Sequence, residues 1–210
     1  MVNKILNFCI DTTFIFKNTH KAFLGAPLFY KDGVDNTFLY GFLRDFLRIR
    51  QLIGINNGIL IIGKEATSVT SKKNVLNIVN LITEIKIPYI HNSKNSVIEI
   101  CNQLRKEISY IISQDKRLLQ IANDEISIII PTDQKKIVCM SRDLIKSKMG
   151  IVPESIPTFL SLTEGVKSSK LTKLQTIRLI ELYGDLDNIY ANITKITPAI
   201  KKKLIHNEQG

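Results

Sequence analysis

The sequence has few of the residues that usually build metal or redox sites. It contains three cysteines, Cys9, Cys101 and Cys139, which lie far apart among apolar neighbours, and three isolated histidines. No two cysteines, and no cysteine and histidine, have the short spacing of a zinc site. We therefore expect buried free thiols in a reducing compartment, and no chemical role for the histidines.

Long apolar runs are also missing. No stretch approaches the roughly 18 apolar residues of a transmembrane helix, so we expect no membrane span. Met1–Ile10 has one lysine and a short apolar run without a small-residue cleavage site, so we expect a first strand rather than a signal peptide. These features predict an intracellular protein of the cytoplasm or an organelle, and the many Ile, Asn and Lys residues fit an AT-rich genome.

Acidic residues are scarce relative to basic ones. The chain has 19 Asp and Glu against 29 Lys and Arg, which gives a net charge of +10 and a pI of about 9.5. Such a balance fits a merely well-solvated basic surface, or it indicates a polyanionic partner such as DNA, RNA or an anionic membrane. We favour nucleic acid, because a basic pI is part of the electrostatic footprint of nucleic-acid-binding proteins.

What the sequence does contain is an alternation of strand-like and helix-like segments over 210 residues. The strand-like runs are apolar almost throughout, as in strands buried on both faces. They are Ile5–Ile10, Gly58–Ile62, Ser109–Ile112, Ile126–Ile130 and Ile137–Met140. Amphipathic helical patterns between them cover Thr37–Arg50, Ser71–Lys86, Ser96–Lys106 and Lys116–Ala122. This order predicts an α/β fold with a mostly parallel, twisted sheet flanked by helices.

After Met140 the pattern becomes helical. We predict helices over Ser141–Lys148, Ile156–Leu162, Leu171–Tyr183 and Leu186–Ala191. Ser141 is the expected N-cap of the first, Gly150 follows its end, and Gly184 joins the last two. The predicted organisation is an α/β core over residues 1–140, a small helical subdomain over 141–200 and a frayed basic tail over 201–210.

Two acidic residues follow predicted strands. Asp11 comes directly after the first strand, and Asp115 follows the strand that ends at Ile112. In open α/β sheets, ligands bind outside the carboxyl ends of the strands. Each Asp could be simply a helix N-cap, or the two could share a divalent cation, which prefers carboxylate oxygens. The two residues alone leave both interpretations open.

Several short motifs follow one another along the chain from about Lys4 to Ile196. They are Ile10–Lys17, Leu39–Leu43, Ile112–Ile121, Ser141–Pro153, Phe159–Leu162 and Leu179–Ile189. The collinear set resembles the 5′-3′ exonuclease and flap endonuclease family, the 5′-nuclease domain found at the N-terminus of DNA polymerase I. The resemblance implies a PIN-like fold, a C-terminal helix–hairpin–helix-like subdomain, DNA as the partner and divalent metal ions as cofactors.

The departures from the family pattern concern mainly its acids. Asp11 and Asp115 remain of the carboxylates that hold two metal ions. The acid expected after the second strand is Gly63, and the second Asp of the Asp-Lys-Asp motif is Arg117. Two further acidic motifs read Ser93–Ser96 and Glu164–Ser168, and three glutamates near the lost positions are out of register: Glu65, Glu99 and Glu164.

Two DNA-binding devices of the family are also reduced. The connection Lys64–Ser71 is short where the family inserts a longer helical arch, and Lys170–Leu174 lacks the glycines of the helix–hairpin–helix turn. Glycines there let backbone N–H groups approach a phosphate. Basic side chains would have to replace this contact, although they are equally compatible with a solvated helix face.

These comparisons of motifs predict a degenerate 5′-nuclease. Asp11 and Asp115 are the remnant catalytic and metal-binding acids and do not suffice by themselves. We expect no cofactor, or Mg²⁺ or Mn²⁺ if residual nuclease activity exists. The residues expected to bind nucleic acid are Lys17, Lys116, Arg117, Lys167, Lys170, Lys173 and Arg178.

Three functions follow from this interpretation. The leading one is a catalytically inactive pseudoenzyme that binds nucleic acid, DNA rather than RNA, or serves in a nucleic-acid assembly. The second is a residual metal-dependent 5′-3′ exonuclease or flap endonuclease that uses Asp11, Asp115 and displaced glutamates. The third is a structural subunit that binds protein partners in a replication or ribonucleoprotein complex, with no membrane contact.

Overall fold

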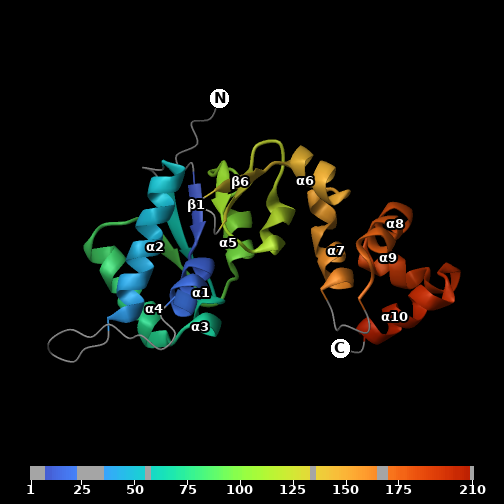
Figure 1. Cartoon of the computed structure of the whole chain (residues 1–210), viewed down its shortest axis with the longest axis horizontal. Helices are drawn as coiled ribbons and strands as arrows, with labels where there is room; N and C mark the ends of the chain where they lie inside the picture. The colour runs from blue at the N-terminus through green and yellow to red at the C-terminus, as the bar shows by residue number, and fades with distance from the viewer. Residues whose placement is uncertain (1–7, 23–35, 55–57, 133–135, 165–169, 209–210) are drawn as a thin grey trace.

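The computed structural model describes residues 8–22, 36–54, 58–132, 136–164 and 170–208 (Figure 1). A sheet with helices on both faces forms the N-terminal part, and helices alone form the C-terminal part. None of the described helices combines the length and the apolar character needed to span a membrane.

The sheet has six strands in the order β3-β2-β1-β4-β5-β6. The strands are β1 (Phe8–Asp11), β2 (Gly58–Ile62), β3 (Tyr89–His91), β4 (Tyr110–Ile112), β5 (Ser127–Pro131) and β6 (Ile137–Met140). The first five run parallel, and β6 is antiparallel to β5. Because β1 pairs with β2 on one side and with β4 on the other, the strand order reverses there, and a crevice is expected at the carboxyl ends of β1 and β4.

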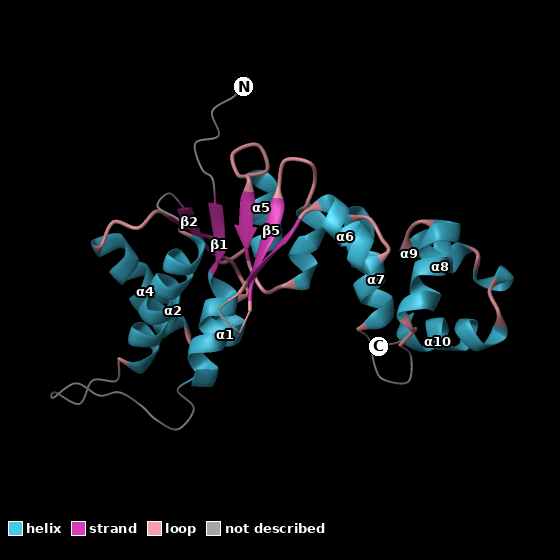
Figure 2. Ribbon diagram, turned by 45° about the horizontal axis from the view of Figure 1, so that its top comes forward, coloured by secondary structure: helices cyan, strands magenta, loops and turns pink. Residues whose placement is uncertain are grey.

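Helices cover both faces of the sheet (Figure 2). On one face lie α1 (Thr12–Ala22), α2 (Thr37–Ile53), α3 (Ala66–Val69) and α4 (Lys72–Glu84). On the other lie α5 (Val97–Gln103) and the 3₁₀ helix η1 (Lys116–Ile121). Ile10 and Leu60 face the first layer, and Cys9 and Ile61 the second. This alternation explains why the strands are apolar at consecutive positions.

The C-terminal helices continue from the second layer. They are α6 (Arg142–Met149), η2 (Pro153–Ser155), α7 (Ile156–Thr163), α8 (Lys173–Tyr183), α9 (Leu186–Ala191), η3 (Ile193–Lys195) and α10 (Pro198–Glu208). Ile145, Phe159 and Ile180 belong to the core cluster of the sheet. A separate cluster that includes Leu162, Ile189 and others joins the last helices. The domain boundary after residue 140 stays a prediction, since apolar packing continues across it.

The mostly parallel sheet flanked by helices is confirmed, and so are the caps of α6. The Ser141 hydroxyl accepts a hydrogen bond from the backbone N–H of Leu144 at 3.3 Å. Gly150 ends the helix with φ of 77°, a left-handed conformation that glycine adopts without strain.

Five local predictions need correction or restriction. Cys139, expected to be a buried thiol like Cys9 and Cys101, is exposed. Strand β3 was missed, because it is an edge strand without a fully buried residue and so lacks the apolar run of the other strands. Lys116–Ala122 was expected to be an ordinary helix but forms the 3₁₀ helix η1, which begins with a bond from the N–H of Leu118 to the carbonyl of Asp115. Residues 201–208 belong to α10 and are not frayed. The predicted strand Ile5–Ile10 begins outside the described residues.

Helix α10 provides a test of its packing through two neighbouring residues. Leu204 is fully buried in the C-terminal cluster, whereas Ile205 is 38% exposed. We expect Leu204→Ala to lower the free energy of unfolding by about 2–5 kcal/mol, because it leaves a cavity. Ile205→Ala should change it by about 0.5 kcal/mol or less. Denaturant unfolding measures both, and equal effects would show that α10 does not pack as described.

Candidate functional site

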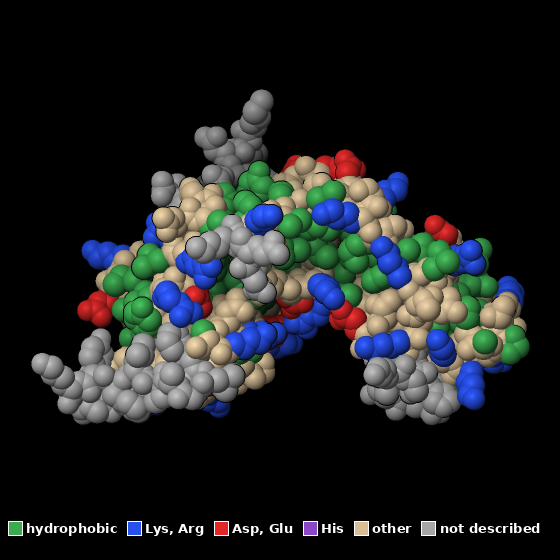
Figure 3. All heavy atoms as spheres, viewed as in Figure 1, with side chains coloured by type: hydrophobic (Ala, Val, Ile, Leu, Met, Phe, Trp, Pro, Cys, Tyr) green, Lys and Arg blue, Asp and Glu red, His purple; other side chains and the backbone are tan. Residues whose placement is uncertain are grey.

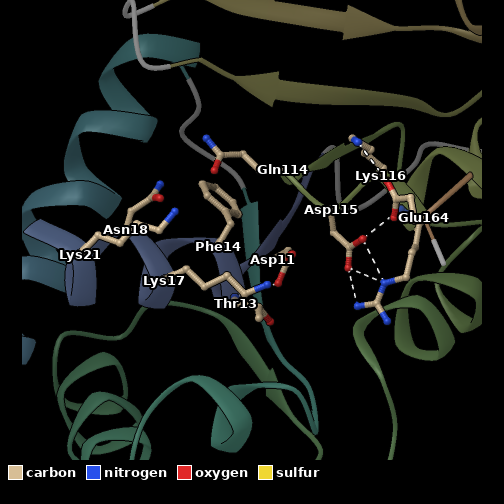
Figure 4. A pocket seen from close by; sticks show the side chains of 11 residues that line it. Asp11, Thr13, Phe14, Lys17, Asn18, Lys21, Gln114, Asp115, Lys116 and Glu164 are labelled. Carbon is tan, nitrogen blue, oxygen red and sulfur yellow. Dashed lines mark hydrogen bonds and ion pairs between the residues drawn. The ribbon is translucent and has the colours of Figure 1, made fainter. Parts of the chain in front are cut away.

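A pocket of about 430 Å³ opens at the carboxyl ends of β1 and β4 (Figure 4). Its walls come from α1, the segment after β4 and the residue that follows α7. Figure 3 shows Lys and Arg side chains gathered along a recess on the underside of the molecule. The charged residues of the lining are the acids Asp11, Asp115 and Glu164 and the cations Lys17, Lys21, Lys116 and Arg117. The pocket thus unites the two acids and three of the basic residues predicted from the sequence.

Asp11 lies at the end of β1 and is almost completely buried, with 2% of its surface exposed. One carboxylate oxygen accepts a hydrogen bond from the N–H of Thr13 at 2.8 Å, and the other accepts one from the Ser113 hydroxyl at 2.6 Å. Burial raises the pKa of Asp11 above its usual 3.8, and the two hydrogen bonds oppose this only in part. Asp11 therefore starts helix α1, as an N-cap residue does, and ionises less readily than a solvated aspartate.

Asp115 is tied to Arg117. Its carboxylate accepts a hydrogen bond from the N–H of Arg117 at 2.9 Å and caps η1. The Arg117 guanidinium binds the same carboxylate in a fork, at 2.6 Å from its Nη2 and 3.0 Å from its Nε. Burial acts to raise the pKa of Asp115, but the hydrogen bonds and charge of Arg117 outweigh it and lower that pKa. Both oxygens of Asp115 are thus engaged with a cation of the same chain.

Ser113 connects the two acids. Its hydroxyl donates to Asp11 and accepts a hydrogen bond from the N–H of Asp115 at 2.9 Å. The hydrogen bonds to Asp115, together with the negative charges of Asp115, Glu65 and Asp11, raise the pKa of Arg117. Arg117 is therefore hydrogen-bonded to Asp115 and also interacts electrostatically with Glu65 and Asp11.

The three displaced glutamates also have partners within the chain. Glu164 pairs with Lys116 at 3.0 Å, and Glu65 accepts a hydrogen bond from the N–H of Val97 at 3.1 Å. Glu99 completes a capping box with Ser96, which lowers the pKa of Glu99. Each glutamate near a lost acidic position thus has a structural role: an ion pair or a helix start.

Gly63 shows why the acid expected after β2 cannot be regained by one substitution. A Cβ atom placed on Gly63 would lie 2.8 Å from the backbone nitrogen of Val97 and 2.8 Å from a carboxylate oxygen of Glu65. Contacts this short require the start of α5 to move. The N-terminus of α5 and Glu65 together fill the space that an aspartate side chain would need.

The residues of this pocket do not fit a two-metal centre. Within the described residues, no group of three or more His, Cys, Asp and Glu could hold a metal ion. Of the two acids that remain, burial disfavours ionisation of Asp11, and Arg117 occupies both oxygens of Asp115. Mg²⁺ requires nearly ideal octahedral oxygen ligands and gives up its water reluctantly, so this donor set is a poor one.

Two lysines of α1 give the pocket its unbalanced positive charge. Lys17 and Lys21 are exposed, and neither forms an ion pair within the described part of the chain. They lie one helical turn apart on one face of α1. The Lys17 side chain extends toward Asp11 (Figure 4). These two ammonium groups are available to an anionic ligand.

The other predicted basic residues lie on the C-terminal helices, outside the pocket lining. The Lys173 ammonium donates to the carbonyl of Lys148 at 2.8 Å and so binds the C-terminal end of α6. Lys170 and Arg178 are exposed. Lys167 lies outside the described residues. A role of these residues in nucleic-acid binding stays a prediction.

Lys21, Asn18 and Gln114 are among the pocket residues that sequence reasoning missed. The spacing of Lys17, Asn18 and Lys21 on one helix face was a usable signal for the first two. Gln114 gave no such signal, because its place depends on a hydrogen bond to the carbonyl of Pro131, 17 residues away.

The buried carboxyl of Asp11 leads to a pH-dependent prediction. Its folded-state pKa is raised, so its ionisation costs stability at pH values above the folded pKa and costs nothing below the usual 3.8. We expect Asp11→Asn, which preserves the cap, to stabilise the fold at pH 7. The gain should vanish as the pH approaches 3.8. Denaturant unfolding across this range measures it, and a less stable variant at pH 7 would contradict the assignment.

Comparison with known proteins identifies a relative in sequence. A 5′-3′ exonuclease of Buchnera aphidicola subsp. Baizongia pistaciae (strain Bp) is 31% identical over 144 residues, which cover 63% of this chain and 46% of that protein. The chain therefore spans about half the length of this relative. No family model matches the chain.

Solved structures share the fold. The catalytic core of Rad2 in complex with DNA substrate has a TM-score of 0.63 at 17% identity, over 97% of this chain and 74% of that chain. The T5 5′-exonuclease with bound zinc ions has a TM-score of 0.62 at 9% identity, over 96% and 85%. The sequence relationship and the shared fold together support a relationship with the 5′-3′ exonuclease and flap nuclease family.

Proposed function

We propose that this protein binds nucleic-acid phosphates without divalent metal ions and does not cleave them. The observation that carries the proposal is the guanidinium of Arg117 on the carboxylate of Asp115. A cation supplied by the chain itself takes the ligand atoms that a metal ion would need. The crevice of a nuclease fold is thereby converted from a metal site into a site for anions.

Loss of the metal ions removes the chemistry of phosphodiester hydrolysis. In two-metal nucleases, the ions generate the attacking hydroxide and stabilise the leaving oxygen. No described side chain at the pocket replaces them as a base, because Asp11 already accepts two hydrogen bonds and Asp115 is held by Arg117. A bound phosphodiester would remain intact.

The remaining charges favour a phosphate ligand. Lys116 and Arg117 form ion pairs with Glu164 and Asp115. Lys17 and Lys21 form no ion pair within the described residues, although the charge of Lys17 also lowers the pKa of Asp115. The net charge of +10 adds a long-range attraction for polyanions. Because Rad2, which shares the fold, is in complex with DNA substrate, we propose DNA rather than RNA as the partner.

Binding to labelled single-stranded and duplex DNA tests this function. We expect the affinity to be equal in Mg²⁺ and in EDTA at matched ionic strength, and to fall steeply as salt increases. Lys17→Ala with Lys21→Ala should reduce the slope of log K against log salt by about 1.4 for single strands, roughly 0.7 for each phosphate contact. Lys106→Ala, an exposed change on the segment after α5, is the control. Fluorescence anisotropy provides the measurement.

Two results of that titration would reject the proposal. Absence of binding at low salt would favour a structural role with protein partners. Mn²⁺-dependent cleavage that Asp11→Asn abolishes would show a residual nuclease instead.

A second prediction concerns Arg117 itself. Arg117→Asp frees Asp115 and adds a carboxylate, so we expect the variant to gain a Mn²⁺ site that the unaltered protein lacks. At ten times Kd, Mn²⁺ should stabilise the variant by about 1.4 kcal/mol. The control is Arg105→Asp, which makes the same charge change at an exposed position near the end of α5. Thermal unfolding with and without Mn²⁺ measures the gain, and equal Mn²⁺ responses of the two variants would refute the role of Arg117.

A further inference from the structure

A second hollow adjoins the pocket. It has a volume of about 380 Å³ and lies between α1, α2 and the end of β5. Phe14, Asn18, Lys21 and Gln114 line both spaces. The two hollows are therefore adjacent along α1, one beside Asp11 and Asp115 and the other beside α2.

The lining of the second hollow differs chemically from that of the first. Ala22, Ile49, Leu52 and Pro131 make it partly apolar, whereas the first pocket is dominated by charged groups. The amide of Gln114 and the hydroxyl of Thr132 add polar groups. Pockets for small molecules combine mainly apolar walls with a few polar groups and measure about 300–1,000 Å³.

The charged residues around the second hollow also favour an anionic ligand. Asp45 forms an ion pair with Arg44 at 2.8 Å and lies within 3.4 Å of the Thr19 hydroxyl, so its charge is compensated inside the protein. Arg48 is exposed on the same wall, and Lys21 stands where the two hollows meet. A ligand that spans both hollows would place negative charge at Lys21 and an uncharged group against the apolar wall.

We propose that the second hollow, here called the base subsite, receives the unpaired base of a nucleotide whose phosphate lies at Lys17 and Lys21. The inference rests on the proposed function and adds a ligand class to it. A nucleobase is flat, largely apolar on its faces and polar at its edge, which matches this lining. A base inside a duplex cannot enter, because its edge is paired and its faces are stacked.

Abasic DNA separates contact with the base from contact with the phosphate. We compare a short single-stranded oligonucleotide with an abasic strand of the same length, at low salt and in EDTA. The protein should bind the strand with bases about tenfold more tightly, within the range found when single bases are accommodated by proteins. Binding of blunt duplex DNA serves as the reference for phosphate contact alone.

Two variants each place a large side chain in the base subsite. Ala22→Trp acts from the exposed end of α1 and Thr132→Trp from the end of β5. Either should abolish the tenfold preference and leave the affinity for the abasic strand and the duplex unchanged. Ala199→Trp, an exposed change on α10, should keep the preference. Thermal unfolding identifies any variant that does not fold, and the other then decides.

The possible failures are distinguishable. Equal affinity of the unaltered protein for the two strands would overturn the base subsite and leave phosphate binding intact. Preserved preference in both tryptophan variants would place the base elsewhere and would also overturn the inference. Absence of binding to every probe would reject the proposed function itself.

Discussion

The ion pair between Arg117 and Asp115 determines what the crevice of this protein can hold. In an open parallel sheet, the strand order reverses between β1 and β4, and the residues that follow these strands meet at one edge. Asp11, Ser113 and Asp115 meet there and share a chain of hydrogen bonds. With Arg117 as its cation, this group is stable without an added ion. Without Arg117, the carboxylate of Asp115 would lose its hydrogen-bonded cation.

The compensation extends beyond this pair. Glu164 is neutralised by Lys116, and Glu65 accepts a hydrogen bond at the start of α5. The carboxylate of Glu99 accepts one from the N–H of Ser96, the N-cap of the same helix. Helix N-termini favour negative charge, so these glutamates stabilise local structure instead of a ligand. Gly63 fits the same account, because α5 approaches β2 so closely that a side chain there would collide with Val97. Packing and ion pairs within the fold thus engage the glutamates and the glycine near the positions where the family pattern has acids.

Much of the fold followed from the sequence because both layers of the core are encoded locally. Near-continuous Ile and Leu runs indicated strands buried on both faces, and Ser141 and Gly150 marked the limits of α6. Strand β3 was missed because it lies at the edge of the sheet and has no fully buried residue. Helix α10 was missed because its apolar residues, such as Leu204, are buried only by packing against α7, α8 and α9. Local pattern specifies elements well but does not specify which distant surfaces they bury.

The sequence predicted the charged residues of the site but not its long-range contacts. Asp11, Asp115, Lys17, Lys116 and Arg117 were identified from their places after strands and from the family motifs, and the structure brings them together. The contact of Glu65 with Val97 spans 32 residues, and the base subsite depends on how α2 packs on α1. No spacing in the sequence encodes such contacts.

Anomalous diffraction from crystals soaked in Mn²⁺ tests the central claim most directly. The account predicts no anomalous peak within coordination distance of Asp11 and Asp115, with Arg117 still on the Asp115 carboxylate. One or two manganese ions bound between these carboxylates, with the guanidinium displaced, would contradict it.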